Sequence, residues 1–365
     1  MKIVEDYMNF DSYKSITDQS VYPIFKNAVD EAFNDVDSIN KMKKYKKIAI
    51  ILLIISIATF LLGIILLFAT ASTGSSSNVI VFIIFSVIAL ILGGVTIFFY
   101  IKFRKILNAI MSKIRNAINV EKIYNESFKK VNNGIDYLSV KENIESLLKS
   151  NRFTAKDIVE NSLTMKEVRS YNFGVPSDAQ LIKKSNKKYL LIDDRYPASF
   201  MNVVYLEIVR NSKGEVTSKR YYNRGVLKID TRSLGHKGFA FTLFKRGFFS
   251  NKPLKLENPQ FNKIVKLYSE DELKARQMYT PLSMELSVKR AKDTNGSVVN
   301  SMYVTSTGDS IYFEYSVPMS FMELDIASST KKEKILDSMY KDFLYDTYTL
   351  YWILSIIYIP IYLDK

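Results

Sequence analysis

Along this chain, hydrophobic positions are most concentrated between Ile48 and Ile101, a stretch that contains no Asp, Glu, Lys or Arg. Two apolar segments of about 23 residues each, Ile48 to Thr70 and Val79 to Ile101, flank a small polar loop from Ala71 to Asn78. As an α-helix each segment is about 34 Å long, and a hydrocarbon core is about 30 Å thick. The pattern therefore predicts two transmembrane helices joined as a membrane hairpin.

Apolar residues also recur at helical spacing on both sides of this hairpin. The stripe before it contains Val21, Phe25, Val29, Phe33 and Val36. The stripe after it contains Phe103, Ile106, Leu107, Ile110, Ile114, Ile118, Ile123, Tyr124 and Phe128. Both extensions leave the membrane on the same side, so we expect them to pack together as a stalk that ends near Asn132-Asn133-Gly134. The alternative is that one stripe lies on the lipid or binds another subunit.

From Ile135 onward, the sequence contains both strand-forming and helix-forming patterns. Runs rich in β-branched and aromatic residues predict strands at Tyr189–Ile192, Asn202–Val209, Arg220–Ile229 and Phe239–Phe244, and a hairpin of Met302–Ser306 with Ser310–Ser316. The segment Asn211 to Gly214 is a candidate hairpin turn. Antiparallel strands with clustered helices predict an α+β domain.

Helix starts in this part are marked by capping residues. A short amphipathic helix is expected at Val140–Leu148. Thr154 with Asp157, and Ser269 with Glu272, have the spacing of a cap and a third helical residue. Asn258-Pro259 and Thr280-Pro281 are caps followed by proline.

The last apolar run, Leu350 to Leu363, is too short for a standard span, and Asp346 and Pro360 sit at its edges. We expect a helix buried on the domain or docked into the membrane interface, and a third span remains the alternative. The predicted organisation is a cytoplasmic amphipathic helix region (1–47), the membrane hairpin (48–101, with spans 48–70 and 79–101), a cytoplasmic stalk helix (102–134), the α+β domain (135–330) and an amphipathic or apolar C-terminal helix (331–365).

The charge distribution predicts an orientation. The net charge is +14, and basic residues abut both spans while the loop between the spans has none: Lys41, Lys43, Lys44, Lys46 and Lys47 before the hairpin, and Lys102, Arg104 and Lys105 after it. By the positive-inside bias, both flanks and the main domain face the cytoplasm. An anionic inner leaflet of the cell membrane is the expected partner of this basic surplus. Nucleic acid is disfavoured, because no recognised binding motif occurs.

Composition excludes several kinds of chemistry. The chain has no Cys and one His, His236, so disulfides, thiolate sites and His-rich metal sites are excluded. Asp193-Asp194 with Glu207 is read as a turn and a strand residue rather than as a metal site. No phosphate-binding glycine motif occurs. Arg276 is expected to pair with Glu270 or Glu272. The sequence therefore predicts no catalytic, cofactor-binding or metal-binding residues.

One segment resembles a known family. The residues that carry the resemblance are Leu256, Pro259, Phe261, Tyr268, Ser269, Asp271, Ala275, Arg276, Thr280 and Pro281. This run is similar to a signature of a bacterial membrane protein family called domain of unknown function 3137. The resemblance implies two early spans, a tight loop, a cytoplasmic α+β domain and a helical C-terminal end. It implies no activity.

These patterns predict a multi-pass, membrane-anchored interaction or scaffold protein whose partners are unidentified membrane proteins or further copies of the chain. Two alternatives stay open. The first is a subunit of an oligomeric channel or transport assembly, against which the uncharged spans count. The second is an enzyme that acts on lipid or cell-wall precursors at the leaflet.

Overall fold

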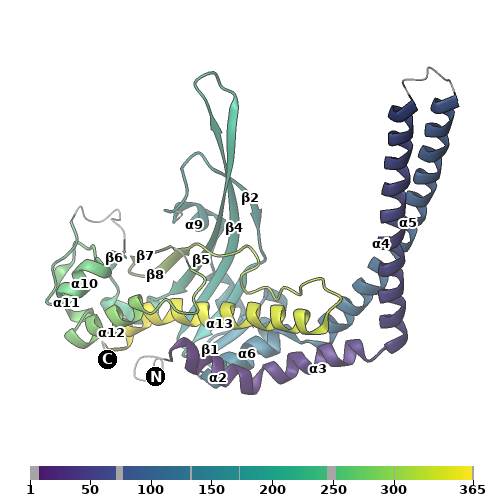
Figure 1. Ribbon diagram of the computed structural model, residues 1–365. Helices are drawn as coiled ribbons and strands as arrows, with labels where there is room; N and C mark the ends of the chain where they lie inside the picture. Colours follow the sequence, from purple (N-terminus) through teal and green to yellow (C-terminus); the bar gives the residue numbers. More distant parts are fainter. Residues whose placement is uncertain are drawn as a thin grey trace. The chain divides into compact units, whose positions relative to one another are not determined.

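A computed structural model describes residues 8–70, 77–131, 134–171, 173–244, 252–299 and 301–363. It divides into two compact units (Figure 1). The hairpin unit comprises residues 24–119 and 326–339, and the sheet unit comprises residues 1–23, 120–325 and 340–365. The chain therefore passes between the two units four times. The expected loop 71–78 lies mostly outside the described residues.

The hairpin unit is built from long helices. Its elements are α3 (Tyr22–Phe33), α4 (Val36–Thr70), α5 (Ser77–Ala117) and the first turns of α13 (Lys332–Leu363). The two apolar segments of the sequence lie within α4 and α5, and both helices continue through their basic flanks without a break. The expectation of two long apolar helices is confirmed.

Several residues of the predicted stalk are buried in the hairpin unit. Phe25 and Val29 of α3 and Leu107 and Ile114 of α5 are buried, whereas Val36 is 64% exposed and does not continue the stripe. The first turns of α13 contact α3, since Lys332 Nζ lies 2.6 Å from Asp30 Oδ1. Sequence periodicity had no means of indicating this third helix, which comes about 300 residues later in the chain.

The remainder of the second stripe belongs to the sheet unit. The helix pauses after Ala117, and α6 (Val120–Val131) carries Ile123, Tyr124 and Phe128 into the core of that unit. The Tyr124 ring lies 5.3 Å from the ring of Tyr137 and 4.9 Å from that of Phe343. Helix α2 (Phe10–Ser20), which lies in the predicted amphipathic helix region and precedes the stripe that begins at Val21, packs in the same unit.

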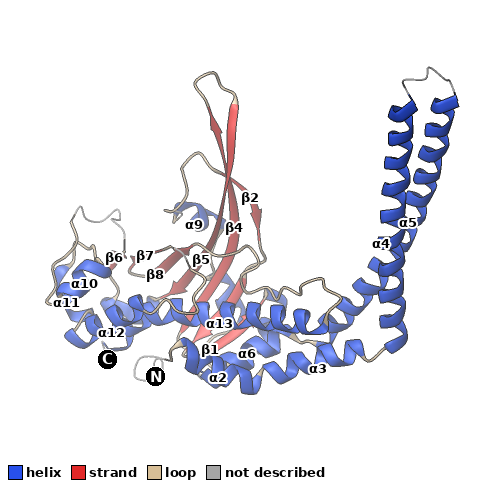
Figure 2. Cartoon of the chain, viewed as in Figure 1, coloured by secondary structure: helices blue, strands red, loops and turns tan. Residues whose placement is uncertain are grey.

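The sheet is antiparallel throughout its described pairs and has the strand order β1-β3-β4-β5-β8-β7-β6, with β2 paired to β4 (Figure 2). The strands are β1 (Ile135–Ser139), β2 (Gln180–Lys184), β3 (Lys188–Ile192), β4 (Tyr196–Arg210), β5 (Val216–Asp230), β6 (Ala240–Leu243), β7 (Met302–Thr307) and β8 (Ser310–Tyr315). The predicted α+β class and the predicted hairpins are confirmed. Strands β1 and β2 were not predicted.

Other segments of the chain pack on both faces of the sheet. On one face, residues such as Met201, Val203 and Val226 pack with Leu163 and Val168 beside α9 (Met165–Ser170). On the same face, α7 (Ile144–Leu147) and α8 (Ala155–Glu160) cover β1 and β3. On the other face, Asn202 Nδ2 donates to the Phe321 carbonyl at 2.7 Å, which fixes the loop that leads to α13.

Short helices complete the domain: η2 (Lys141–Asn143), η3 (Arg232–Lys237), α10 (Pro259–Ile264), α11 (Glu272–Met278) and α12 (Pro281–Lys292). The caps predicted at Thr154, Asn258 and Thr280 are confirmed by their hydrogen bonds. The capping box at Ser269 is wrong. Asp271 caps α11 and accepts from the Lys274 amide, while the Ser269 hydroxyl donates to the Ala240 carbonyl at 2.7 Å.

Candidate functional site

The helices of the hairpin expose an extensive apolar surface. Helices α4 and α5 contain segments, Val36–Phe68 and Val79–Ala117, that are long and apolar enough to cross a membrane. Only 6% and 11% of their most apolar windows are buried within the structure. Leu90 is 76% exposed and Phe68 is 73% exposed. A core helix of a soluble protein would bury such residues, so this exposure is typical of a surface that lipid covers.

Three hydroxyls within the hairpin donate to backbone oxygens, whereas the buried Ser86 hydroxyl has no hydrogen-bond partner among the described residues. Ser56 Oγ donates to the Ala89 carbonyl of the other helix at 2.8 Å. Thr59 and Thr96 donate to carbonyls of their own helices, Ile55 and Leu92, each at 2.8 Å. The three bonded hydroxyls therefore need no hydrogen-bond partner from outside the protein, as an apolar surrounding would require.

The predicted membrane-flanking basic residues lie at one end of this hairpin. Lys41, Lys43, Lys44, Lys46 and Lys47 are in α4 and are exposed, as are Lys102, Arg104 and Lys105 in α5. The Lys102 ammonium lies 4.6 Å from the centre of the Phe98 ring and 6.0 Å from that of Tyr45. Lys46 Nζ donates to Thr330 Oγ1 at 3.4 Å. The antiparallel helices thus bring the two basic segments together into one collar.

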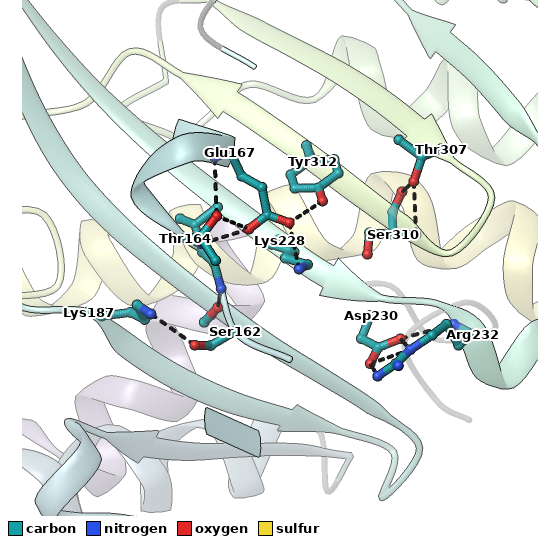
Figure 3. A network of polar contacts seen from close by, with 12 residues as sticks. Ser162, Thr164, Glu167, Lys187, Lys228, Asp230, Arg232, Thr307, Ser310 and Tyr312 are labelled. Carbon is teal, nitrogen blue, oxygen red and sulfur yellow. Dashed lines mark hydrogen bonds and ion pairs between the residues drawn. The ribbon is translucent and has the colours of Figure 1, made fainter. Parts of the chain in front are cut away.

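A polar network lies on the sheet face that α9 covers (Figure 3). Glu167 of α9 points toward β5 and β8, where its Oε1 accepts from Lys228 Nζ at 2.7 Å and from the Tyr312 hydroxyl at 2.6 Å. Its Oε2 accepts from the Thr164 amide and hydroxyl at 2.7 and 2.8 Å, which caps α9. The Tyr171 ring stacks on Tyr312 with centroids 3.8 Å apart.

Electrostatics fix the charge states in this network. Burial alone would raise the pKa of Glu167, but the hydrogen bonds from Lys228, Tyr312 and Thr164 outweigh it and lower that pKa below its usual value. Burial and the Glu167 carboxylate raise the pKa of Tyr312. At neutral pH a carboxylate therefore faces a neutral phenol, and neither group is poised to exchange a proton. The network binds α9 to the sheet.

A second polar cluster lies further along the same face. Arg224 Nε of β5 lies 2.9 Å from Glu314 Oε1 of β8, and these side chains are 11% and 1% exposed. Gly174 completes the cluster, since its amide donates to Glu314 at 3.0 Å and its carbonyl accepts from Arg224 at 2.7 Å. A cavity of about 450 Å³ opens beside it, lined by Tyr221, Asn223, Val298 and Pro318 among others.

Sequence reasoning missed both clusters, because their members are far apart along the chain. Glu167 and Tyr312 are 145 residues apart, and Gly174 and Glu314 are 140 apart. The available signal was the alternation of β5, which places Arg224, Val226 and Lys228 on one face, but the partner strand and its register were needed to use it.

A third cluster fixes the C-terminal helix. Arg290 of α12 has a fully buried side chain, its Nε donates to Ser355 Oγ of α13, and its guanidinium lies 5.2 Å from the Tyr351 ring. Residues Leu350 to Ile356 of α13 are buried. The part of the last apolar run that the structure describes in full is therefore a core helix of the sheet unit, as first expected.

The family-like motif spans α10, α11 and the start of α12 in the sheet unit. Leu256, Phe261, Tyr268 and Ala275 are buried, and Ser269, Asp271 and Thr280 hold local turns and caps. Pro259 and Pro281 occupy first helical positions. Arg276 pairs with Glu272 at 2.6 Å and with Glu257, not with Glu270. These residues build the fold and do not converge on a cavity described here.

The carboxylates that the sequence analysis weighed as a metal site are not brought together. Within the described part of the chain, no group of three or more His, Asp or Glu side chains could hold a metal ion. Asp193 and Asp194 form the tight turn between β3 and β4, both with positive φ. Glu207 accepts from the Tyr222 hydroxyl at 2.6 Å and pairs with Arg220. The side chain of His236 lies outside the described residues.

The described elements define a helical hairpin combined with an antiparallel α+β sheet domain. The family described as "Protein of unknown function (DUF3137)" matches residues 208–349, which include β5 to β8, α10 to α12 and the first half of α13. This match confirms the family resemblance over that part of the chain. No curated protein and no solved structure matches this chain.

Proposed function

We propose that this protein is anchored in the cell membrane by α4 and α5 and presents its sheet domain on the cytoplasmic face as an interaction or scaffold module. The observation that carries the proposal is the exposure of the hairpin: its apolar windows are 6% and 11% buried. Leaving so much apolar surface in water costs about 25 cal/mol per Å², which lipid removes.

The basic collar supports the cytoplasmic orientation. All eight collar residues lie at the end of the hairpin away from its turn, and residues 48–101 have no charge. Lys and Arg beside spans are retained on the cytoplasmic side, and each contributes about 1 kcal/mol of attraction to an anionic leaflet.

Two features of the sheet domain support a role in binding other proteins. We define the β4–β5 arm as residues 207–220; it extends beyond the other strands in Figure 1 and most of its residues are exposed. Residues 216–224 of β5, which precede Gly225, have no strand partner on the β8 side among the described residues. An unpaired strand edge is a template for a strand from another chain.

Anchoring makes modest contacts sufficient. A tethered domain and a tethered partner search a thin layer together, so their effective concentration is raised without any new contact. Further copies of this chain and other membrane proteins are the partners that we expect.

The absence of cysteine makes the topology directly testable. Single substitutions Ser75→Cys and Asn133→Cys would be labelled in whole cells with a maleimide that does not cross membranes. We expect Ser75→Cys to react in intact cells and Asn133→Cys to react only after permeabilisation. Release of the wild-type protein by alkaline carbonate, or the reverse labelling, would contradict the proposal.

The scaffold role needs its own test. Purification in mild detergent, followed by mass determination of the intact assembly, should recover partner proteins in fixed ratio. Ion flux through liposomes that contain the purified protein alone would instead favour the channel alternative. Turnover of a lipid precursor would favour the enzyme.

A further inference from the structure

One flank of the hairpin carries a groove that begins at the basic collar. A cavity of about 310 Å³ lies between α4 and α5, and its lining includes Ala49 and Leu53 from α4 and Tyr100 and Phe103 from α5. Lys46 stands at its collar end. The Thr96 hydroxyl, which also lines the cavity, donates to the Leu92 carbonyl, so the walls offer little polarity.

A second cavity of about 580 Å³ continues along the same flank. Its lining includes Ser56 and Leu61 from α4 and Gly93 and Gly94 from α5, and it shares Ile97 with the first cavity. The α4 residues recur every three or four positions from Lys46 to Leu61, which places them on one helix face. At 1.5 Å per residue, this face is about 22 Å long.

The opposite flank near the collar is filled by side chains. There the Tyr45 ring lies 5.8 Å from the ring of Phe99, and the Lys102 ammonium covers both Tyr45 and Phe98. The two flanks thus differ: one has a lysine resting on aromatic rings, and the other has a lysine at the mouth of an apolar groove.

We propose that this groove binds one anionic phospholipid, with its phosphate at Lys46 and one acyl chain laid along the groove toward Gly94. The inference rests on the proposed membrane insertion. The length fits, because half of a 30 Å hydrocarbon core is about 15 Å and the groove exceeds it. The charge fits as well, because a headgroup phosphate is an acceptor for the Lys46 ammonium.

A second copy of the hairpin suits this groove less well. Residues 48–101 contain no Asp or Glu, so the span of another copy has no carboxylate to place beside Lys46. An amphiphile with an anionic end and a long apolar end complements both parts of the groove.

Gly94 allows the groove to be filled without strain. Gly94 lines the second cavity, and a Cβ added there would meet no atom within 4 Å, so the side chain of Gly94→Phe can begin at this wall of the groove without a clash. The matched control is Ile91→Phe, because Ile91 is 62% exposed on the same helix and does not line either cavity. Lys46→Gln removes the charge, and Lys102→Gln is its control on the filled flank.

The experiment is native mass spectrometry of the full chain, reconstituted in vesicles of equal phosphatidylglycerol and phosphatidylcholine and then released into mild detergent. We expect one retained phosphatidylglycerol per wild-type chain, with at least tenfold selectivity. Gly94→Phe and Lys46→Gln should lower this occupancy tenfold or more, while Ile91→Phe and Lys102→Gln leave it unchanged. Retention by Gly94→Phe, or equal losses in Lys46→Gln and Lys102→Gln, would overturn the site.

Two further readouts separate the possible outcomes. Carbonate extraction of the same variants reports insertion: a protein that is stripped from vesicles refutes the proposed anchoring, whereas an inserted protein without selectivity refutes the lipid site alone. A wild-type dimer that Gly94→Phe converts to monomer would show a second copy in the groove, and would also refute the lipid site.

Discussion

Gly296 shows how one residue controls the packing of distant segments. Its φ is +77°, and an added Cβ would overlap the Phe10 ring, which itself stacks at 5.2 Å on Tyr345. Gly296→Ala should therefore lower the unfolding free energy by roughly 2–4 kcal/mol, from the left-handed backbone and from overpacking together. Denaturant unfolding of the protein in detergent measures this loss.

Gly214→Ala is the matched control for that substitution. Gly214 has a φ of +81° in the turn of the β4–β5 arm, but nothing lies within 4 Å of an added Cβ. Only the backbone cost of about 1–2 kcal/mol applies there. Equal losses in the two variants would show that contact with Phe10 contributes nothing.

Asp342 of α13 makes stability depend on pH. Burial, with the nearby Asp325 carboxylate, raises its pKa to about 6, although the Asp325 amide donates to it at 2.9 Å. The folded state thus holds a proton that the unfolded state releases near pH 4. Protonation of Asp342 therefore makes its full contribution to the unfolding free energy below pH 4, and this contribution is lost as the pH rises through 6.

Asp342→Asn should remove that dependence. At pH 7.5 we expect the variant to be more stable than the wild type by about 1 kcal/mol, a figure reduced for partial solvent screening, and to be equal near pH 4. Thermal melts between pH 4 and 8 test this. Asp346, which is buried next to it and also has a raised pKa, will preserve part of the slope.

Capping shows what the sequence predicts well at the residue scale. Thr154, Asn258 and Thr280 were identified correctly because a cap depends on a residue and its neighbours two or three positions on. Ser269 was misassigned because its hydroxyl is used by the Ala240 carbonyl, 29 residues earlier. A tertiary contact decided that outcome, and local spacing carries no sign of it.

Helix α13 is held to α12 by Arg290, so the two elements should loosen together. Burial lowers the pKa of this arginine to about 10, which leaves it charged at neutral pH among the Tyr348, Tyr351 and Ser355 side chains. Arg290→Ala should lower the unfolding free energy by roughly 3–5 kcal/mol, because it opens a cavity and leaves the polar groups around the buried guanidinium without their partner.

Limited proteolysis provides the readout for Arg290→Ala. We expect cleavage to appear in the segment that follows α12, while the hairpin unit stays intact. Arg276→Ala is the control, because Arg276 pairs with Glu257 and Glu272 at the surface and should cost below about 1 kcal/mol. Unchanged protease resistance in Arg290→Ala would contradict the assigned role.

The β4–β5 arm should be dispensable for stability and required for partner capture. Replacing Ile208–Lys219 by an Asn-Gly turn joins Glu207 to Arg220, which already face each other in register. Because the removed side chains are mostly exposed, we expect the unfolding free energy to change by about 1 kcal/mol or less. Recovery of partners in the mild-detergent assay should fall at least fivefold, with Gly214→Ala as the intact-arm control.

At the scale of elements, the sequence predicted where the strands lie better than which strands pair and in what register. The runs that contain Tyr189, Asn202 and Arg220 were placed correctly, but β4 and β5 are each longer than the runs that indicated them. Strand β2 escaped detection, since four of its five residues are exposed. The pairs Glu167–Lys228 and Arg224–Glu314 depend on register, which a single strand does not encode.

At the scale of the whole molecule, the collar should decide orientation. Replacing all eight collar residues by Gln removes the charge asymmetry across the spans, so we expect Ser75→Cys in that background to react from both sides of the membrane. The control replaces exposed lysines of the sheet domain, such as Lys183, Lys184, Lys213 and Lys219, by Gln and should keep the labelling one-sided. A one-sided pattern without the collar would contradict the charge argument.

The hairpin itself was read from the sequence with little ambiguity, because a long uncharged apolar run has few structural alternatives. The division into units was not. Periodicity assigned Tyr124 and Phe128 to the stalk, whereas they lie in the sheet unit, and α13 contributes to both units. Such sharing depends on contacts between distant segments.

The pairing of α2 with α13 has a consequence for biosynthesis. The Tyr340 hydroxyl donates to Asp18, a partner 322 residues earlier. At 5–20 residues per second, a ribosome needs roughly 16–64 s to make the intervening chain. During that interval the aromatic side chains of α2 lack the part of their native cover that α13 supplies, so a nascent-chain chaperone that shields this helix should raise the yield of correctly assembled protein.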